Sequence, residues 1–342
     1  MARLVLRTLA FVVAIGCVAS LGEHAGAQTL KAVKERGTVA CGVSRGVIGF
    51  SAQSDDKSWA GIDADFCRAL AAAIFDDASK VDFVPLSAED RFQALQSRKI
   101  DILARNSTWT MGRETELGLL FAGVNFYDGQ GFLVRHARKV GSALELTGAK
   151  VCVQSGTTTE LNLRDYFAAN NMRYEAMPMA TLEEALAAYV AGRCDVLTAD
   201  ASALHGERLK TPEPGDHDIL PEIISKEPLG PAVRDDDVQW FNIVKWVNFA
   251  LLNAEELSIS SETLDAALSS AKPEVRRLVG SEGNFGEQIG LTRDWAARII
   301  RRVGNYAEVY ERNIGVKSKL GIPRGINQLW TSGGILYAPP IR

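Results

Sequence analysis

The sequence lacks most of the motifs that mark common classes of enzyme. Among its 342 residues there are only four histidines, and they show no metal-ligand spacing: His24, His136, His205 and His217. It contains no P-loop lysine motif and no H-E-x-x-H motif. The glycines of GVSRGVIG do not have the spacing of a dinucleotide-binding loop. We therefore expect no metal and no other cofactor.

The sequence also lacks an excess of positive charge. It has 38 basic and 42 acidic residues, which gives a formal net charge of −4 at pH 7. A chain with this balance has no general attraction for nucleic acid or for an anionic membrane surface. We expect neither as a partner.

Only one long hydrophobic run is present, and it lies at the N-terminus. In MARLVLRTLAFVVAIGCVAS, two arginines precede the run, and Ala25 and Ala27 follow in an A-x-A arrangement. This pattern is typical of an export signal rather than of a membrane span. We predict that residues 1–27 are a signal peptide cleaved after Ala27. The alternative is a lipid anchor on Cys17, although Ala14 fits a lipoprotein cleavage site poorly.

Four cysteines remain after this cleavage, and export permits disulfide bonds. Cys152 and Cys194 belong to neighbouring strands of one expected sheet. Cys41 lies in the strand VACGV, and Cys67 lies on the next helix, which packs back over that strand. We expect the pairs Cys41 with Cys67 and Cys152 with Cys194. Buried free thiols are the alternative.

A chain of this length normally forms two domains. Strand-like and helix-like segments alternate along it, which predicts parallel sheets with helices on both faces. The expected strands include TVACGV, VDFVPL, IDILA, KVCVQ, YEAMPM and CDVLTA. The expected helices are 63–75, 88–96, 158–169, 181–191, 236–253 and 292–313. Thr181 and Glu184 form a capping-box pattern at the start of one of them.

One unit of sequence occurs twice. The segments ALQSRKIDILARNSTWTMGR and AAYVAGRCDVLTAD each contain a helix, a short buried strand and then polar residues. When they are aligned, Asp101 matches Asp195 and Asn106 matches Asp200. Ligands bind beyond the carboxyl ends of strands in open α/β sheets. The first copy offers Arg113 and hydroxyls there, and the second offers a carboxylate, so the two copies predict a clamp for the charged ends of a free amino acid.

Longer motifs resemble one family. DGQGFLVR, VCVQSGTTTELNL, LPEIISKEPLGPAVR and the ending YAPPIR are similar to the general L-amino-acid-binding periplasmic proteins of polar-amino-acid ABC importers, within extracellular solute-binding protein family 3. The resemblance covers the whole mature chain. It implies a two-lobed type II periplasmic binding fold, each lobe a doubly wound, mostly parallel α/β sheet, joined by two crossing strands. Residues 28–130 and 229–342 would form lobe I, and residues 131–228 would form lobe II.

The resemblance also implies roles for individual residues. The family's carboxylate-binding arginine falls on Arg113, and neighbouring contacts to that carboxylate fall on Asn106 and Thr108. The group at the start of the second lobe's first helix falls on Thr157 and Thr158, and the ammonium acceptor falls on Asp200. The helix N-terminus at Thr158 suits a carboxylate because its free N–H groups point at the ligand.

The sequence departs from the family near the side-chain pocket. Val47 occupies the position where many relatives have a covering aromatic residue. Arg45 precedes Phe50 with a spacing one residue shorter than in binders of acidic amino acids, so Arg45 and Phe50 are only candidates for this pocket. We expect Arg105 to be structural or to face the rim.

These observations predict a monomeric periplasmic binding protein that captures free L-amino acids broadly and delivers them to an inner-membrane ABC permease. Hinge closure would bend residues 128–131 and 229–231. A dehydratase-like enzyme on the same fold is the alternative, with Glu160 as its candidate carboxylate, although Glu160 also fits a first-turn helix position.

Overall fold

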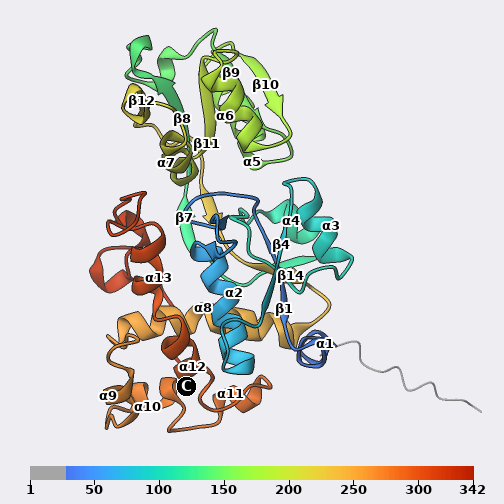
Figure 1. Ribbon diagram of the computed structural model, residues 1–342, viewed down its shortest axis with the longest axis vertical. Coiled ribbons are helices and arrows are strands. Elements are labelled where there is room, and N and C mark those ends of the chain that lie inside the picture. The colour runs from blue at the N-terminus through green and yellow to red at the C-terminus, as the bar shows by residue number, and fades with distance from the viewer. Residues whose placement is uncertain (1–27) are drawn as a thin grey trace, which may run out of the picture.

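The computed structural model describes residues 28–342 and shows an α/β protein of two lobes, one above the other (Figure 1). Each lobe is built on a five-stranded sheet. The predicted signal peptide, its cleavage site and Cys17 lie outside the described residues. Within residues 28–342, no helix is both long and apolar enough to cross a membrane.

The lower sheet in Figure 1, that of lobe I, has the strand order β4-β1-β5-β14-β6. Its strands are β1 (Val39–Val43), β4 (Val81–Pro85), β5 (Ile102–Leu103), β6 (Leu119–Phe121) and β14 (Ala232–Arg234). The first three in spatial order are parallel, whereas β14 runs antiparallel to β5 and β6. β1 is buried along its whole length, as expected for a strand covered on both faces.

The sheet of lobe II has the corresponding order β10-β9-β11-β8-β12. Its strands are β8 (Gln130–Arg135), β9 (Lys150–Gln154), β10 (Glu175–Met179), β11 (Val196–Asp200) and β12 (His217–Ile219). Here too three strands are parallel, and β8 is antiparallel to both of its neighbours. Both sheets are therefore mixed. β8 and β14 each follow a crossing between the lobes, and each runs antiparallel to the strands beside it.

The sequence repeat has a structural counterpart in both lobes. The carboxylate of Asp101 accepts a hydrogen bond from the backbone N–H of Ala40 at 2.8 Å, and that of Asp195 accepts one from Lys150 at 2.8 Å. Each aspartate therefore fixes the first parallel strand of its lobe beside the third. The helix before each aspartate ends with a residue at positive φ, Arg98 in one copy and Gly192 in the other.

Helices cover both sheets. Those of lobe I before the first crossing are α1 (Gln28–Arg36), α2 (Ile62–Phe75), α3 (Asp90–Gln96) and α4 (Met111–Thr115), with a small hairpin of β2 (Ala52–Gln53) and β3 (Trp59–Ala60). Lobe II contains α5 (Thr158–Ala169), α6 (Leu182–Val190) and α7 (Ala201–Leu209). The predicted capping box is present, because the Thr181 side chain and Glu184 bond each other's backbone N–H groups.

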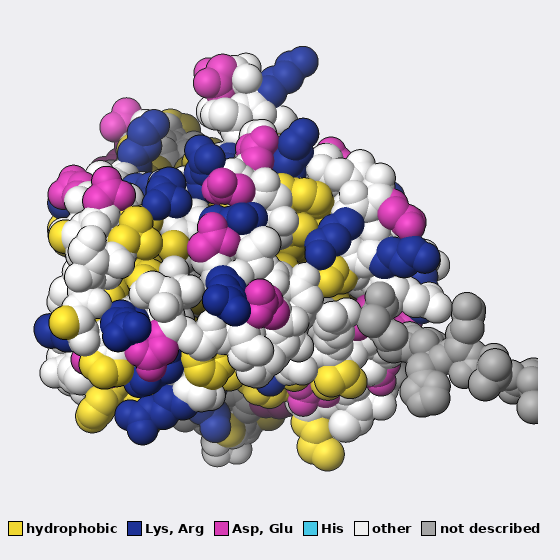
Figure 2. Space-filling model, turned by 90° about the horizontal axis from the view of Figure 1, so that it is seen from below, with side chains coloured by type: hydrophobic (Ala, Val, Ile, Leu, Met, Phe, Trp, Pro, Cys, Tyr) yellow, Lys and Arg dark blue, Asp and Glu magenta, His cyan; other side chains and the backbone are white. Residues whose placement is uncertain are grey.

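The C-terminal helices complete lobe I. They are α8 (Val238–Glu256), α9 (Leu264–Leu268), α10 (Pro273–Val279), α11 (Phe285–Gln288), α12 (Trp295–Arg302) and α13 (Tyr306–Asn313). α8 and α12 pack against α2, and all three contribute to one large core cluster. Seen from below, this end of the molecule carries charges of both signs among scattered hydrophobic side chains (Figure 2).

The single helix predicted over residues 292–313 is wrong. The structure has two helices there, α12 and α13, because Gly304 takes a φ of 95° and ends the first helix. Asn305 then begins the second helix with its own capping box to Glu308.

Two short strands connect the lobes. β7 (Phe126–Asp128) and β13 (Glu227–Leu229) form an antiparallel pair in which Glu227 lies opposite Asp128. In Figure 1 both run through the narrow region between the sheets. Two crossing strands are what the family resemblance implies.

Each lobe contains one disulfide, and the pairs are those expected from the sequence. Cys41 is bonded to Cys67 and so ties β1 to α2. Cys152 is bonded to Cys194 and so ties β9 to the segment before β11. Both bonds lie in buried parts of the core.

Candidate functional site

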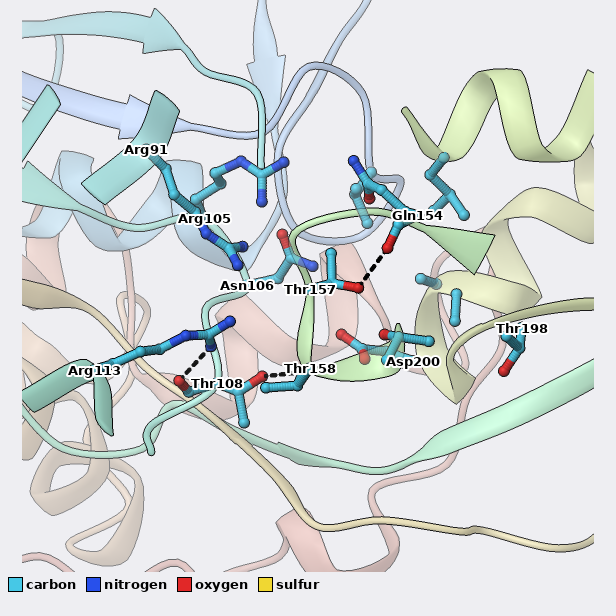
Figure 3. Close-up of a pocket in the computed structure, with 15 residues that line it drawn as sticks. Arg91, Arg105, Asn106, Thr108, Arg113, Gln154, Thr157, Thr158, Thr198 and Asp200 are labelled. Atoms are coloured by element: carbon cyan, nitrogen blue, oxygen red, sulfur yellow. Dashed lines mark hydrogen bonds between the residues drawn. The ribbon is translucent and has the colours of Figure 1, made fainter. Parts of the chain in front are cut away.

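A cavity lies between the two lobes, at the ends of the strands of both sheets (Figure 3). It is lined from lobe I by Val47, Arg91, Arg105, Asn106, Thr108 and Arg113, and from lobe II by Gln154, Thr157, Thr158, Thr159, Leu182, Thr198, Ala199, Asp200 and Ala203. We call it the clamp cavity. It brings together all six residues that the sequence analysis assigned to ligand binding.

Arg113 lies on α4, whose first turn is capped by the side chain of Thr110. One guanidinium nitrogen, Nη1, donates to the backbone carbonyl of Thr108 at 2.6 Å, and the group lies 5.0 Å above the ring of Phe92. Among the described residues, no carboxylate forms an ion pair with it. Burial lowers the pKa of Arg113, although the carboxylates of Glu227 and Asp200 raise it in part.

Asp200 is the last residue of β11 and approaches the cavity from the opposite side (Figure 3). It is 9% exposed, and no group within residues 28–342 donates a hydrogen bond to its side chain. Burial raises its pKa well above the ordinary value, and the nearby carboxylates of Asp128 and Glu227 raise it further. A cationic ligand group would relieve this repulsion.

Asn106 and Thr108 follow β5 at the edge of the cavity. The backbone N–H of Asn106 donates to Asp63 at 2.7 Å, and the residue adopts a φ of 35°. Its buried side-chain oxygen has no hydrogen-bond partner among residues 28–342. Asparagine tolerates this left-handed conformation better than most residues, so it can occupy this position.

Thr157 and Thr158 begin α5 in lobe II. The Thr157 hydroxyl donates to the carbonyl of Gln154 at 2.7 Å, so it does not cap the helix (Figure 3). The hydroxyl of Thr158 lies 3.3 Å from that of Thr108. The free N–H groups of the first turn therefore face a cavity whose opposite wall belongs to the other lobe.

Glu227 connects both walls of the cavity, and sequence reasoning missed it. It is 1% exposed on the crossing strand β13. Its carboxylate accepts hydrogen bonds from Thr108 and from Thr158 at 3.1 Å, and one from Asn162 at 2.7 Å. In the sequence, Glu227 lies within LPEIISKEPLGPAVR, which the sequence analysis uses only for the family resemblance.

Two further arginines line the cavity beside Arg113. Arg91, at the start of α3, is 3% exposed, and its Nε has no hydrogen-bond partner in the described part of the chain. The Nε of Arg105 donates to the carbonyl of Leu86 at 3.1 Å. Arg105 is only 7% exposed, so it does not face the rim. Burial lowers the pKa of Arg105 to about 10. Burial also lowers the pKa of Arg91 well below its usual range, and the neighbouring guanidiniums lower it further.

The two candidates for the side-chain pocket lie elsewhere. Phe50 is 1% exposed and packs edge-on against Phe126 in the core of lobe I, and it is not among the residues that line the clamp cavity. Arg45 is exposed and lines a second, adjoining cavity. Val47 lines both cavities and separates them in part.

The described residues contain no arrangement that indicates catalysis. Residues 42–46 match the serine-hydrolase pattern G-x-S-x-G. However, the hydroxyl of Ser44 is fully buried and bonded to the side chain and the carbonyl of Ser51. Glu160 does not line the clamp cavity. Within residues 28–342, no group of histidine, cysteine and acidic side chains could hold a metal ion.

Comparison with known proteins gives consistent relatives over nearly the whole chain. The general L-amino acid-binding periplasmic protein AapJ of Rhizobium johnstonii is 54% identical, with 97% of each chain covered. The glutamate/glutamine/aspartate/asparagine-binding protein BztA of Rhodobacter capsulatus is 49% identical over 97% of this chain and 99% of its own.

A solved structure is also similar. A periplasmic binding protein of an ABC transporter from Brucella ovis, with glutathione bound, is 51% identical. It superposes with a TM-score of 0.91 over 92% of this chain and 100% of its own. Residues 39–259 match the model of the bacterial extracellular solute-binding proteins, family 3. The two lobes, the cavity between them and these relatives all point to one family. The chain belongs to family 3 of the bacterial extracellular solute-binding proteins.

Proposed function

We propose that this protein captures free L-α-amino acids in the clamp cavity and delivers them to an inner-membrane ABC permease. The observation that carries the proposal is a pair of opposite charges without protein partners. Among the described residues, the Arg113 guanidinium bonds only a carbonyl, and the Asp200 carboxylate accepts no hydrogen bond. The carboxylate and ammonium of an amino acid would complete both groups at once.

The remaining residues of the clamp supply neutral contacts in this proposal. Asn106 and Thr108 would bind the ligand carboxylate from lobe I, and Thr157, Thr158 and the N-terminus of α5 would bind it from lobe II. Glu227 already bonds Thr108 and Thr158, so it holds one residue of each lobe at the cavity. Ligand contacts from both lobes would favour the closed arrangement.

We further propose broad selectivity for side chains. The clamp binds groups that all L-amino acids share. Val47 offers no aromatic ring for stacking, while Arg91 and Arg105 line the cavity without an ion pair in the described part of the chain. A neutral side chain can bind beside them, and an acidic one gains their charge.

Calorimetric titration with leucine, glutamine and glutamate tests this selectivity. We expect all three to bind with free energies within about 1.5 to 3 kcal/mol of one another, roughly a ten- to hundredfold range. One ligand that dominates by several orders of magnitude would refute broad selectivity and leave the clamp intact. No binding of any amino acid would refute the proposed function.

The dehydratase-like alternative has no support in the site. The relatives are solute-binding proteins rather than enzymes, and the alternative's carboxylate, Glu160, is outside the cavity. The ligand of the Brucella ovis structure, glutathione, carries a free α-amino and α-carboxyl group on one carbon. A clamp for these two groups would accept that end of the molecule as well.

We also propose that the chain is exported to the periplasm, loses residues 1–27 and acts as a monomer. Lobe I would comprise residues 28–130 and 229–342, and lobe II residues 131–228. Mass spectrometry of the protein recovered from periplasm should find Gln28 at the N-terminus, and light scattering should give the mass of one chain. A lipidated Cys17 would contradict the cleavage site.

A further inference from the structure

A second cavity continues from the clamp cavity between the same two lobes. We call it the outer chamber. Four side chains line both cavities and form the boundary: Val47, Arg105, Gln154 and Leu182. Its volume is about 360 Å³, which falls in the roughly 300–1,000 Å³ range of small-molecule sites. A side chain that leaves the clamp between Val47 and Gln154 would enter it.

The outer chamber contains charged and polar groups from both lobes. Arg45 of lobe I lines it and has no ion-pair partner among the described residues. Glu207 of lobe II is 2% exposed, and one of its carboxylate oxygens has no hydrogen-bond partner within the described residues. The other oxygen accepts from Lys210 at 2.6 Å, and Lys210 also donates to the carbonyl of Gly46 at 3.1 Å across the cleft. The chamber therefore offers a cation and a free acceptor to a ligand.

We propose that the outer chamber is a second subsite that binds the distal part of γ-glutamyl peptides. The glutamyl α-carboxylate and α-ammonium would lie in the clamp. The isopeptide bond would pass the boundary side chains, an N–H of the extension would face Glu207, and the distal carboxylate would lie near Arg45. The proposal rests on the proposed function, because it needs the amino-acid clamp.

The clamp determines which kind of peptide can extend into the chamber. Arg113 and Asp200 require a free carboxylate and a free ammonium on one α-carbon. In an ordinary dipeptide the first residue has lost its α-carboxylate to the peptide bond. A γ-linked dipeptide keeps both groups on the glutamyl carbon, and its extension leaves through the side chain toward the outer chamber. The geometry therefore favours the γ-linked isomer over the α-linked one.

Two isomeric dipeptides and one amino acid test the proposal by calorimetry. We expect glutamine and γ-L-glutamylglycine to bind, and α-L-glutamylglycine to bind at least about thirtyfold more weakly than its isomer, because it leaves a clamp charge unpaired. Equal binding of the two isomers would overturn the proposal. So would binding of glutamine without γ-L-glutamylglycine, although the proposed function would stand. If glutamine itself does not bind, both fall together.

A substitution in the outer chamber locates the extension. Arg45→Ala should weaken γ-L-glutamylglycine by up to about fivefold, the upper end of the range for an exposed ion pair, and leave glutamine unchanged. The matched control is Arg301→Ala on the exposed face of α12, which should change neither ligand. Equal losses for both ligands in Arg45→Ala would show that Arg45 acts on the clamp, and no loss for γ-L-glutamylglycine would show that its extension lies elsewhere. Either result would overturn the assignment.

Discussion

Arg113 contributes a charge to the cavity and forms no ion pair within the described residues. We predict that Arg113→Ala weakens binding of every amino acid by about 2 to 5 kcal/mol, because the ligand carboxylate is then buried without its charged partner. Titrations of leucine, glutamine and glutamate should show parallel losses. Arg164→Ala, at an exposed ion pair with Asp165 in lobe II, is the control and should bind normally. Wild-type affinity in Arg113→Ala would rule out the clamp.

The second charge of the clamp predicts a dependence on pH. Burial and neighbouring carboxylates raise the pKa of Asp200, and burial raises that of Asp128 to about 6. A ligand ammonium stabilises the ionised carboxylate, so binding releases any proton that Asp200 holds in the free protein. Affinity is then greatest above the raised pKa of Asp200 and falls as pH decreases through it.

Leucine is the suitable ligand for this measurement, because its side chain does not titrate and its α-carboxylate and α-ammonium both stay charged around neutral pH. Asp200→Asn should bind leucine more weakly at neutral pH and show a flatter pH profile. Glu160→Gln, in the first turn of α5 and outside the cavity, should keep the wild-type profile. A profile that is flat in the wild-type protein would contradict the role of Asp200 as ammonium acceptor.

The site residues that the sequence predicts are those that follow strands. Asn106 and Asp200 can be found because they occupy matching positions after matching strands. Residues that follow parallel strands lie together at one edge of the sheet, where ligands bind. Arg91 and Glu227 could not be found in this way. Arg91 lies at the start of a helix and lines the cavity, whereas Glu227 lies on a crossing strand and bonds the lining residues Thr108 and Thr158. Tertiary packing rather than the local sequence places both.

At the level of elements, the C-terminal segment supports the first crossing strand. Asn327 is 4% exposed, and its side chain bonds both backbone groups of Tyr127, accepting from the N–H at 2.7 Å and donating to the carbonyl at 2.9 Å. The hydroxyl of Tyr306 donates to the carbonyl of Asn125 at 2.7 Å. Both side chains lie beyond residue 259, where the family match ends. The C-terminal segment therefore holds β7, the crossing strand next to the expected hinge at residues 128–131, against lobe I.

We predict that Asn327→Ala lowers the free energy of unfolding by about 1 to 3 kcal/mol, because it leaves two backbone groups of Tyr127 unpaired. Denaturation in urea measures this loss, and hydrogen exchange should increase at Tyr127. The control is Asn170→Ala, whose side chain bonds a single carbonyl on the surface of α5. It should change stability by less than about 0.5 kcal/mol. Unchanged exchange at Tyr127 would show that the strand does not depend on Asn327.

Strong local signals in the sequence predict helices well, whereas the point at which one helix ends and the next begins is harder to detect. The helix predicted over residues 158–169 has the bounds of α5, and the capping box of Thr181 is present. The pattern over residues 292–313 remains helical on both sides of Gly304, so periodicity alone joins α12 to α13. The break is marked locally by Gly304 at a φ of 95° and by the capping box of Asn305 and Glu308, which periodicity does not detect.

At the level of the whole molecule, the described arrangement has the lobes in contact. Thr108 lies 3.3 Å from Thr158, and Lys210 of lobe II bonds the carbonyl of Gly46 of lobe I at 3.1 Å. When the lobes close without a ligand, the three arginines that line the clamp cavity come together with no anion between them. Their mutual repulsion costs free energy. A ligand that bridges Arg113 and Asp200 removes this cost only in the closed state, so it must shift the population of lobes toward closure.

We therefore predict that a saturating amino acid reduces the radius of gyration measured by small-angle X-ray scattering. The backbone should rotate at residues 128–131 and 229–231, where the two crossing strands leave their pairing. Arg113→Ala at the same ligand concentration should keep the larger radius, because the bridge between the lobes is missing. If the wild-type protein has the same radius with and without ligand, binding does not require movement of the lobes. The clamp would then be preformed, and the contacts between Gly46 and Lys210 would persist in the free protein.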